Sequence, residues 1–277
     1  MRIAISNIAW DPTDDAMVAE ILQQYRVDAI DIAPGKYFAD PKTATAQDIQ
    51  AVRQQWQARG IEITGMQALL FGTTGLNVFG ANDIQHALLA QLEGVCRVAE
   101  GLGATRLVFG SPRNRDRSGL SDDQALAQAR DFFRRLGDVA ATHGVQICLE
   151  PNPPRYGANF MIDSDSTAAV VRAVEHPAIR MQLDTGALTI NEEDAARVLE
   201  EHAELIGHVH ASEPDLVTLG EGSTNHDGIA FALTRRLPEQ VVSIEMLPAK
   251  QGSNLAALER GVQVAVKAYR DLPEAAV

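Results

Sequence analysis

The sequence predicts an α/β protein of the closed (β/α)8, or TIM, barrel class, folded as a single domain over residues 1–277. Short apolar, β-branched runs alternate with longer amphipathic segments along the chain, which is the pattern of parallel strands joined by helices. Eight such runs are present, and 277 residues is close to the roughly 250 that such a barrel needs. No Gly-x-Gly-x-x-Gly motif opens the first helix, which disfavours an open doubly wound sheet that binds a dinucleotide.

The eight strand-like runs follow one another without a long Gly/Ser linker or a second composition regime between them. They lie near residues 2–9, 29–34, 62–69, 106–112, 145–151, 180–186, 206–212 and 241–247. This even spacing indicates one barrel rather than two domains.

The segments between the runs have apolar residues three and four positions apart, so each predicted helix has one face for the barrel wall. Before the fourth run these residues are Ile84, Leu88, Leu92, Val95, Ala99 and Leu102. Gly60, Gly103 and Gly144 each follow such a helical pattern and precede a strand. We expect them to end the helices in a left-handed conformation that lets the chain reverse.

Composition excludes several classes of partner. The net charge of -13 and a pI of about 4.9 oppose binding to nucleic acid. No segment approaches the roughly 20 apolar residues of a membrane span, and the N-terminus does not resemble a secretory leader, so we expect a cytoplasmic protein with no membrane partner. Cys96 and Cys148 fall in helical and strand patterns and are expected to be buried thiols. The exposed helical faces could form an interface, so the sequence leaves the oligomeric state, including a homo-oligomer, undecided.

The last four runs carry the candidate site. Side chains alternate between the two faces of a strand, and in these runs one face is apolar while the other is polar. The polar face must point into the barrel, and it ends in Glu150, Asp184, His210 and Glu245. Active sites of such barrels lie at the carboxyl ends of the strands. The sequence therefore predicts that these four side chains converge at the barrel mouth.

Three converging carboxylates would repel one another unless a cation compensates their charge. Three oxygen donors and one imidazole fit an octahedral cation better than a closed thiolate zinc site. We therefore expect one divalent metal ion, with Mn²⁺ as the first expectation and Mg²⁺, Co²⁺ or Zn²⁺ as alternatives.

Four motifs resemble the metal motifs of the xylose isomerase-like superfamily of sugar isomerases and epimerases. They are Leu149-Glu150-Pro151-Asn152, Leu183-Asp184-Thr185-Gly186, His208-Val209-His210-Ala211-Ser212-Glu213 and Ser243-Ile244-Glu245. Their order and spacing match over almost the whole chain and are similar to those of ketose 3-epimerases. The resemblance implies a metal-dependent enzyme of carbohydrate metabolism that moves a proton between carbons of a small sugar or polyol through an enediolate. It implies Glu150 and Glu245 as the acid/base pair.

The sequence departs from the ketose epimerase pattern at two expected substrate contacts. Ala187 stands where those enzymes have a histidine, and Leu216 stands where they have an arginine. The substrate therefore stays open among a ketose, another polyol and a sugar acid. A dehydration, as in the related inosose and dehydroshikimate dehydratases, is the main alternative reaction. A hydrolase similar to abasic-site endonucleases needs more histidines than the 7 present, and a sugar-binding barrel without catalysis is the last alternative.

Further residues near the predicted mouth are candidate substrate contacts. His208 could instead be a buried hydrogen-bonded histidine, and the others could be surface or packing residues. Aromatic side chains could pack on a sugar ring, and an arginine in the loop after the fourth run could bind an anionic group. These candidates are His208, Glu213, His226, Trp10, Phe71 and Arg113.

Overall fold

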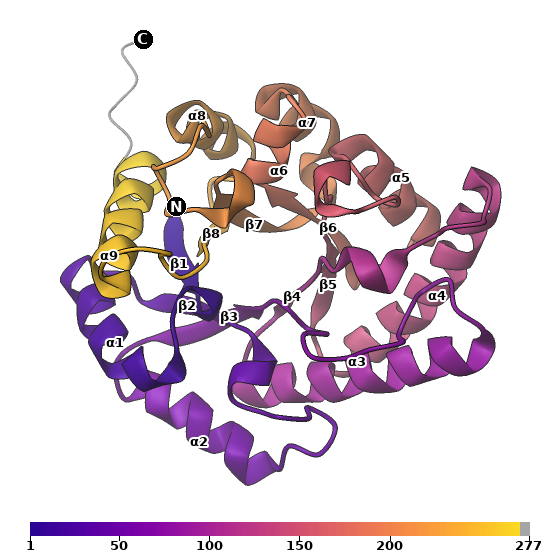
Figure 1. The fold of residues 1–277 in the computed structure, drawn as a ribbon, viewed down its shortest axis with the longest axis horizontal. Helices are drawn as coiled ribbons and strands as arrows, with labels where there is room; N and C mark the ends of the chain where they lie inside the picture. Colours follow the sequence, from indigo (N-terminus) through magenta and orange to yellow (C-terminus); the bar gives the residue numbers. More distant parts are fainter. Residues whose placement is uncertain (272–277) are drawn as a thin grey trace.

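The computed structural model, which describes residues 1–271, is a closed barrel of eight parallel strands ordered β1 to β8 (Figure 1). The predicted (β/α)8 class is thereby confirmed. The strands are β1 (Arg2–Ser6), β2 (Ala29–Ile32), β3 (Glu62–Met66), β4 (Arg106–Phe109), β5 (Gln146–Leu149), β6 (Ile179–Asp184), β7 (Ile206–Ser212) and β8 (Val241–Glu245). The first and last strands pair with each other in parallel, which closes the barrel.

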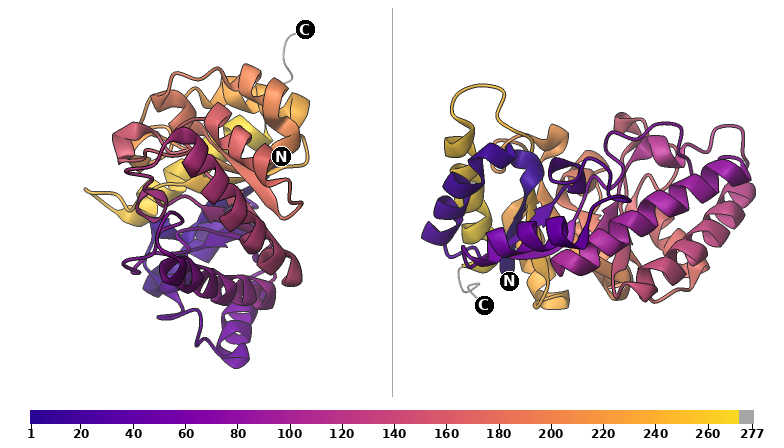
Figure 2. Two further views of the ribbon diagram at one scale, coloured as in Figure 1. Left: turned by 90° about the vertical axis from the view of Figure 1, so that its right-hand side faces the viewer. Right: turned by 90° about the horizontal axis from the view of Figure 1, so that it is seen from below.

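The helices surround the strands as an outer ring (Figures 1 and 2). They are α1 (Asp15–Gln24), α2 (Ala46–Gln57), α3 (Asn82–Leu102), α4 (Asp122–Thr142), α5 (Ser164–Val174), α6 (Thr185–Ile190), α7 (Ala195–His202), α8 (His226–Arg236) and α9 (Asn254–Ala265). Within residues 1–271, no helix combines the length and the apolar character needed to cross a bilayer.

Local sequence explains where the elements end. Gly103 caps α3 with a φ of 86°, and Gly60 and Gly144 have φ values of 72° and 65°, as their positions predicted. Several strands are shorter than the predicted runs. The run predicted at residues 2–9 ends at Ser6, because the Ser6 hydroxyl accepts from the Ile8 N–H and turns the chain into a short 3-10 helix.

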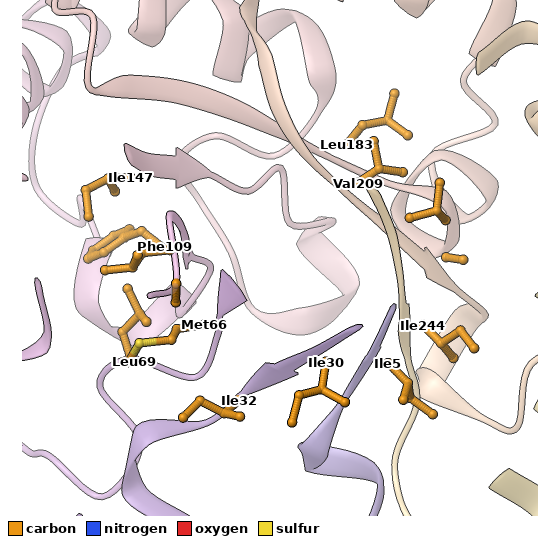
Figure 3. Close-up of a cluster of buried hydrophobic side chains, with 14 of the residues drawn as sticks. Ile5, Ile30, Ile32, Met66, Leu69, Phe109, Ile147, Leu183, Val209 and Ile244 are labelled. Carbon is orange, nitrogen blue, oxygen red and sulfur yellow. The ribbon is translucent and has the colours of Figure 1, made fainter. Parts of the chain in front are cut away.

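The apolar faces of all eight strands form a continuous core against the helices. Figure 3 shows this cluster, which includes Ile5, Ile30, Met66, Phe109, Ile147, Leu183, Val209 and Ile244. Cys96 and Cys148 are both buried free thiols, as predicted. The core accounts for one face of each strand and leaves the other face to line the barrel interior.

The interior face is polar and is defined by the strand register. Cross-strand pairing aligns Gln182 with His208, Asp184 with His210, and Ser212 with Glu245. The side chains of Gln182, His208 and His210 are buried. The sequence alternation therefore identified the inward faces of the last four strands correctly.

Candidate metal centre

Glu150, Asp184, His210 and Glu245 come together at the carboxyl ends of β5 to β8. Each offers a ligand atom, and these atoms all lie within 4.8 Å of one another. Asp184 and Glu245 end their strands, Glu150 follows β5 directly, and His210 lies within β7. The four side chains thus converge at the barrel mouth, as the strand pattern predicted.

The Asp184 carboxylate is held by the turn that opens α6. One of its oxygens accepts a 2.6 Å hydrogen bond from the Ala187 N–H, and Ser212 Oγ lies 2.9 and 2.8 Å from the two oxygens. Gly186 leaves room for this contact, because a Cβ there would lie 2.7 Å from Ser212 Oγ. Asp184 is therefore fixed before any ligand binds.

Glu245 is held between a glutamine and a histidine. Gln67 Nε2 donates to Glu245 Oε1 at 2.9 Å, and His210 Nδ1 lies 3.3 Å from Glu245 Oε2. Gln67 is buried directly after β3. Sequence reasoning missed Gln67, because an amide at a strand end carries no charge or ligand signature.

Glu150 is positioned by the loop after β4. Arg115 is buried, and its Nη1 donates to the Glu150 carbonyl at 2.6 Å while Nη2 donates to the Gly110 carbonyl at 3.3 Å. A Cβ on Gly110 would lie 1.6 Å from Glu150 Oε2, so only glycine leaves space for this carboxylate. Arg115 and Gly110 therefore clamp the ends of β4 and β5 around Glu150.

The four side chains of Glu150, Asp184, His210 and Glu245, here called the ligand group, concentrate negative charge in a buried volume. Burial, Glu245 and Asp184 raise the pKa of Glu150 to about 8, and burial with Glu245 raises the pKa of Asp184 to about 6. Burial disfavours the His210 cation, but the three carboxylates outweigh it and raise the pKa of His210 to about 9. Protons thus offset the mutual repulsion of the carboxylates.

A divalent cation fits this donor set. Three carboxylates and one imidazole are ligands of borderline-hard cations, and a cation can replace the shared protons as the compensating charge. Neither ring nitrogen of His210 makes a hydrogen bond of good geometry among the described residues, although Nδ1 lies 3.3 Å from Glu245 Oε2. An imidazole left in this state is suited to coordinate an ion.

A second buried group lies next to the first. His208 Nε2 is 2.9 Å from Asp31 Oδ2, with side-chain exposures of 3% and 1%, and Thr64 donates to Asp31 Oδ1 at 3.1 Å. The His208 and His210 rings meet edge to face with centroids 4.9 Å apart. Burial raises the pKa of Asp31, but His208 outweighs it and the net pKa is lowered. His208 thus lies inside the barrel, paired with Asp31.

Glu213 and His226 organise the loop after β7. Glu213 accepts from the N–H groups of Gly220 and Thr224, both at 2.9 Å, and lies 3.1 Å from His226 Nε2. Burial opposes its charge, yet these hydrogen bonds, with that from His226 the largest, lower the pKa of Glu213 to about 2. His226 is buried and its Nδ1 lies 2.6 Å from the Tyr269 hydroxyl. The structure thus gives His226 two protein partners beneath the loop.

The remaining candidates lie apart from the ligand group. Trp10 is only 1% exposed, donates to Asp15 at 2.8 Å and packs edge-on against Trp56. Phe71 is 83% exposed, and Arg113 is exposed. Within residues 1–271, Trp10, Phe71 and Arg113 are not among the residues that line the cavity at Glu150, Asp184 and Glu245. Their contacts with a substrate stay predictions, and Trp10 is a core residue in the structure.

A cavity of about 400 Å³ lies over the ligand group. The strand ends supply Glu150, Asp184 and Glu245 to it, and the segments beyond them supply Tyr156, Ala187, Leu216 and Leu247. This volume is within the range of about 300–1,000 Å³ that small-molecule sites have. The carboxylates are thus open to a small ligand.

Another acidic group occurs on the outer surface. Asp165, Glu201 and His202 lie within 4.8 Å of one another. Arg197 pairs with Asp165 at 3.3 Å and with Glu201 at 2.7 Å, and His202 lies 2.8 Å from Asp165. Its charges are balanced by neighbouring side chains, unlike those at the barrel mouth.

Known proteins with this fold are numerous, and several are sugar enzymes. A structure of D-psicose 3-epimerase with D-tagatose from Clostridium cellulolyticum H10 has a TM-score of 0.78 at 19% identity, covering 98% of this chain and 99% of that one. The 3-keto-D-glucoside 4-epimerase of E. coli has a TM-score of 0.79 at 18% identity, covering 95% and 98%. The IOLI protein with a zinc atom has a TM-score of 0.76 at 15% identity, covering 99% and 100%. At these identities the likeness establishes the fold.

Sequence comparison gives the family. Ketose 3-epimerase from Arthrobacter globiformis is 29% identical over 110 residues, which are 40% of this chain and 38% of that protein. The matched stretch thus spans under two fifths of that relative. The model of the xylose isomerase-like TIM barrel family matches residues 19–268, which is most of the barrel. The chain therefore belongs to the xylose isomerase-like TIM barrel family, as its four motifs predicted.

Proposed function

We propose that the protein is a metal-dependent sugar isomerase or epimerase. It would move a proton between carbons of a small polyhydroxy carbonyl substrate, with Glu150 and Glu245 as the acid/base pair. The observation that carries this proposal is the convergence of three carboxylates and an imidazole beneath a cavity of about 400 Å³. The names of the similar proteins, which include ketose 3-epimerase and D-psicose 3-epimerase, support it.

Glu150, Asp184, His210 and Glu245 would hold one divalent cation, with Mn²⁺ as our first choice. The donor set supports this choice, because oxygen ligands dominate and thiolates are absent from it. The bound cation supplies the positive charge that lowers the pKa of a C–H bond next to the substrate carbonyl. Asp184 and His210 serve as ligands, whereas Glu150 and Glu245 also face the substrate.

The acid/base pair follows from the position of the two glutamates. Glu150 and Glu245 come from β5 and β8, three strands apart in the barrel, and both line the cavity. A carboxylate on one side removes a proton from carbon and leaves an enediolate. The carboxyl group on the other side returns a proton to the opposite face of that carbon or to its neighbour. The first outcome is an epimerisation and the second an isomerisation.

The supporting residues keep these two carboxylates in place. Arg115 binds the Glu150 backbone at 2.6 Å, and Gln67 binds the Glu245 carboxylate at 2.9 Å. Proton transfer requires the carboxylate oxygen within hydrogen-bond reach of the reacting carbon. Fixed glutamates therefore favour one reacting carbon over its neighbours.

Hydrogen exchange with solvent tests the proposal. The Mn²⁺-loaded protein is incubated with ketoses and other polyhydroxy ketones in deuterium oxide, and carbon-bound deuterium is followed by NMR. We expect exchange into at least one compound, loss of exchange on chelation, and at least a 1,000-fold reduction in Glu150→Gln and Glu245→Gln, roughly the size of a lost acid/base group.

Glu239→Gln is the matched control, because Glu239 is an exposed carboxylate away from the mouth, and this variant should exchange normally. Exchange that survives both active-site substitutions would contradict the assigned acid/base pair. A new conjugated carbonyl absorbing in the ultraviolet would instead identify the dehydratase alternative.

A further inference from the structure

The cavity over the ligand group is strongly acidic. Among the described residues that line it are five acidic side chains and neither Lys nor Arg. The acidic residues are Glu150, Asp184, Glu213, Asp215 and Glu245. A single divalent cation leaves this lining negative, so a phosphate or carboxylate on a substrate would be repelled.

Two arginines contact the acidic residues, but neither is among the described residues that line the cavity. Arg115 is buried, and two of its nitrogens donate to the backbone carbonyls of Glu150 and Gly110. Arg155 pairs with Asp215 at the rim. Both guanidinium groups are thus engaged by the protein, and the acidic lining favours an uncharged ligand.

Apolar side chains also line the cavity, and Leu216 and Leu247 come from the segments beyond the ends of β7 and β8. Ala187, Leu216 and Leu247 line it, together with Pro151, Pro153 and Tyr156. The Leu247 side chain is 44% exposed, and its N–H donates to the Leu216 carbonyl at 2.9 Å. A ligand that covered these side chains would remove apolar surface from water.

The Leu216 turn is held in a strained conformation. Asp215 and Leu216 have φ values of 61° and 52°, which are rare for residues other than glycine. The turn is fixed by the Leu216 N–H to the Glu213 carbonyl at 2.9 Å and by the Asp215 N–H to the Tyr156 hydroxyl at 2.7 Å. Strain maintained by such contacts is typical of functional sites, and here it keeps Leu216 in the cavity wall.

We infer that the substrate is an uncharged polyhydroxy ketone with an apolar group at the end remote from its carbonyl, the simplest case being the methyl group of a 6-deoxy ketose. This inference rests on the proposed function, because the carbonyl end is assigned to the carboxylate side of the cavity. The apolar group lies against Leu216 and Leu247. Sugar phosphates and sugar acids are excluded by the acidic lining.

Three matched ligands test the inference by calorimetric binding to the full-length, Mn²⁺-loaded protein. They are a ketohexose, its 6-deoxy counterpart and its 6-phosphate. We expect the 6-deoxy sugar to bind roughly 3- to 10-fold more tightly than the parent ketose, the gain typical of burying one methyl group. We expect the phosphate to bind most weakly. A phosphate or parent sugar that binds as well as the 6-deoxy sugar would overturn the inference, as would the absence of binding by all three.

Leu216→Asn locates the preference. Asparagine tolerates positive φ, so this variant should keep the turn while replacing the apolar wall with an amide. We expect its preference for the 6-deoxy sugar to disappear, and a preference that persists would refute the role of Leu216. Leu126→Asn on α4, where Leu126 is 36% exposed, is the control and should keep the preference.

Deuterium exchange into the same ligands separates this inference from the proposed function. A preference for the 6-deoxy sugar without any exchange would contradict proton transfer and support the assignment of the apolar end. Exchange without that preference would support the proposed reaction and overturn the inference.

Discussion

The two halves of the barrel contribute different kinds of groups to the same site. Strands β5 to β8 supply the four side chains of the ligand group. Strands β1 to β4 and the loops that follow them supply Gln67, which donates to the Glu245 carboxylate, and Gly110 and Arg115, which lie against Glu150. They also supply Asp31, which pairs with His208 next to His210. In the proposed site, the second half (β5 to β8) supplies the candidate ligands and the acid/base pair, and the first half (β1 to β4) holds them in position.

The largest expected effect is the pH dependence of Mn²⁺ affinity, because side chains from β5 to β8 must lose protons when the cation binds. At pH 7 the raised pKa values of Glu150, about 8, and His210, about 9, leave both groups mostly protonated without a cation. Binding Mn²⁺ requires both protons to leave, so affinity should increase as pH rises from 7 toward 9, by roughly 10- to 100-fold per pH unit. Calorimetry in buffers of different ionisation enthalpy should detect about two protons released at pH 7, and none released would contradict this account.

Gly110→Ala is the strongest test of how β1 to β4 and their loops support the metal centre. The new methyl group would overlap the Glu150 carboxylate, which must then move away from the other ligands. We expect Mn²⁺ affinity to fall by about 100-fold, at the upper end for substitutions around a metal site, with the barrel still folded. Affinity is measured by competition with a chromogenic chelator, and Gly35→Ala, where the added Cβ meets nothing within 4 Å, is the control. Unchanged affinity would show that Glu150 is not a ligand.

Asp31→Asn removes charge from β2 without changing shape. The Asp31 carboxylate holds His208 at 2.9 Å and belongs to a buried group with His210. His208 in turn packs edge to face against the His210 ring with centroids 4.9 Å apart. We expect about 10-fold weaker Mn²⁺ binding, because residues that hold a metal ligand in place through its neighbours affect affinity by about this factor. Asp165→Asn in the surface acidic group should leave Mn²⁺ affinity unchanged. Equal affinities of wild type and Asp31→Asn would mean that β1 to β4 and their loops support only Glu150 and Glu245, and not His210.

Glu213→Gln is expected to have the least effect on the metal centre. This substitution should lower the stability of the fold and leave Mn²⁺ binding unchanged. An amide cannot accept from both Gly220 and Thr224 as the carboxylate does, and lost hydrogen bonds to a charged group cost about 1.5–3 kcal/mol at pH 7. The lowered pKa of about 2 means that this stability is present above pH 4.5 and is lost as pH falls toward 2. Urea unfolding should show the variant approaching wild type over that range, with Mn²⁺ affinity at pH 7 unchanged. A constant difference at all pH values would contradict the role of the charge.

The fold and the convergence of the four candidate ligands could be predicted because both depend on local periodicity. Strand alternation alone assigns Asp184, His210 and Glu245 to inward faces, and parallel strands place their ends together. The supporting residues follow no such pattern. Arg113, Arg115 and Arg117 occur at alternate positions in one loop, and the sequence does not distinguish them. Only Arg115 is buried, because it binds the carbonyls of Glu150 and Gly110 at the ends of two different strands.

Other supporting residues depend on contacts between distant segments. His226 follows a loop-like sequence, but Glu213 and Tyr269 enclose it from 13 residues before and 43 residues after. Sequence reasoning also missed Asp31, although a lone carboxylate within a buried strand needs a partner and could have indicated it. That partner, His208, is five strands later in the sequence, so the pairing required the closed barrel.

We expect one divalent cation to bind at the ends of β5 to β8. Anomalous diffraction from crystals soaked in Mn²⁺ would locate it. We predict one peak per chain within about 2.0–2.6 Å of ligand atoms from Glu150, Asp184, His210 and Glu245. Mn²⁺ density absent from this group, or found instead at Asp165, Glu201 and His202, would contradict the account.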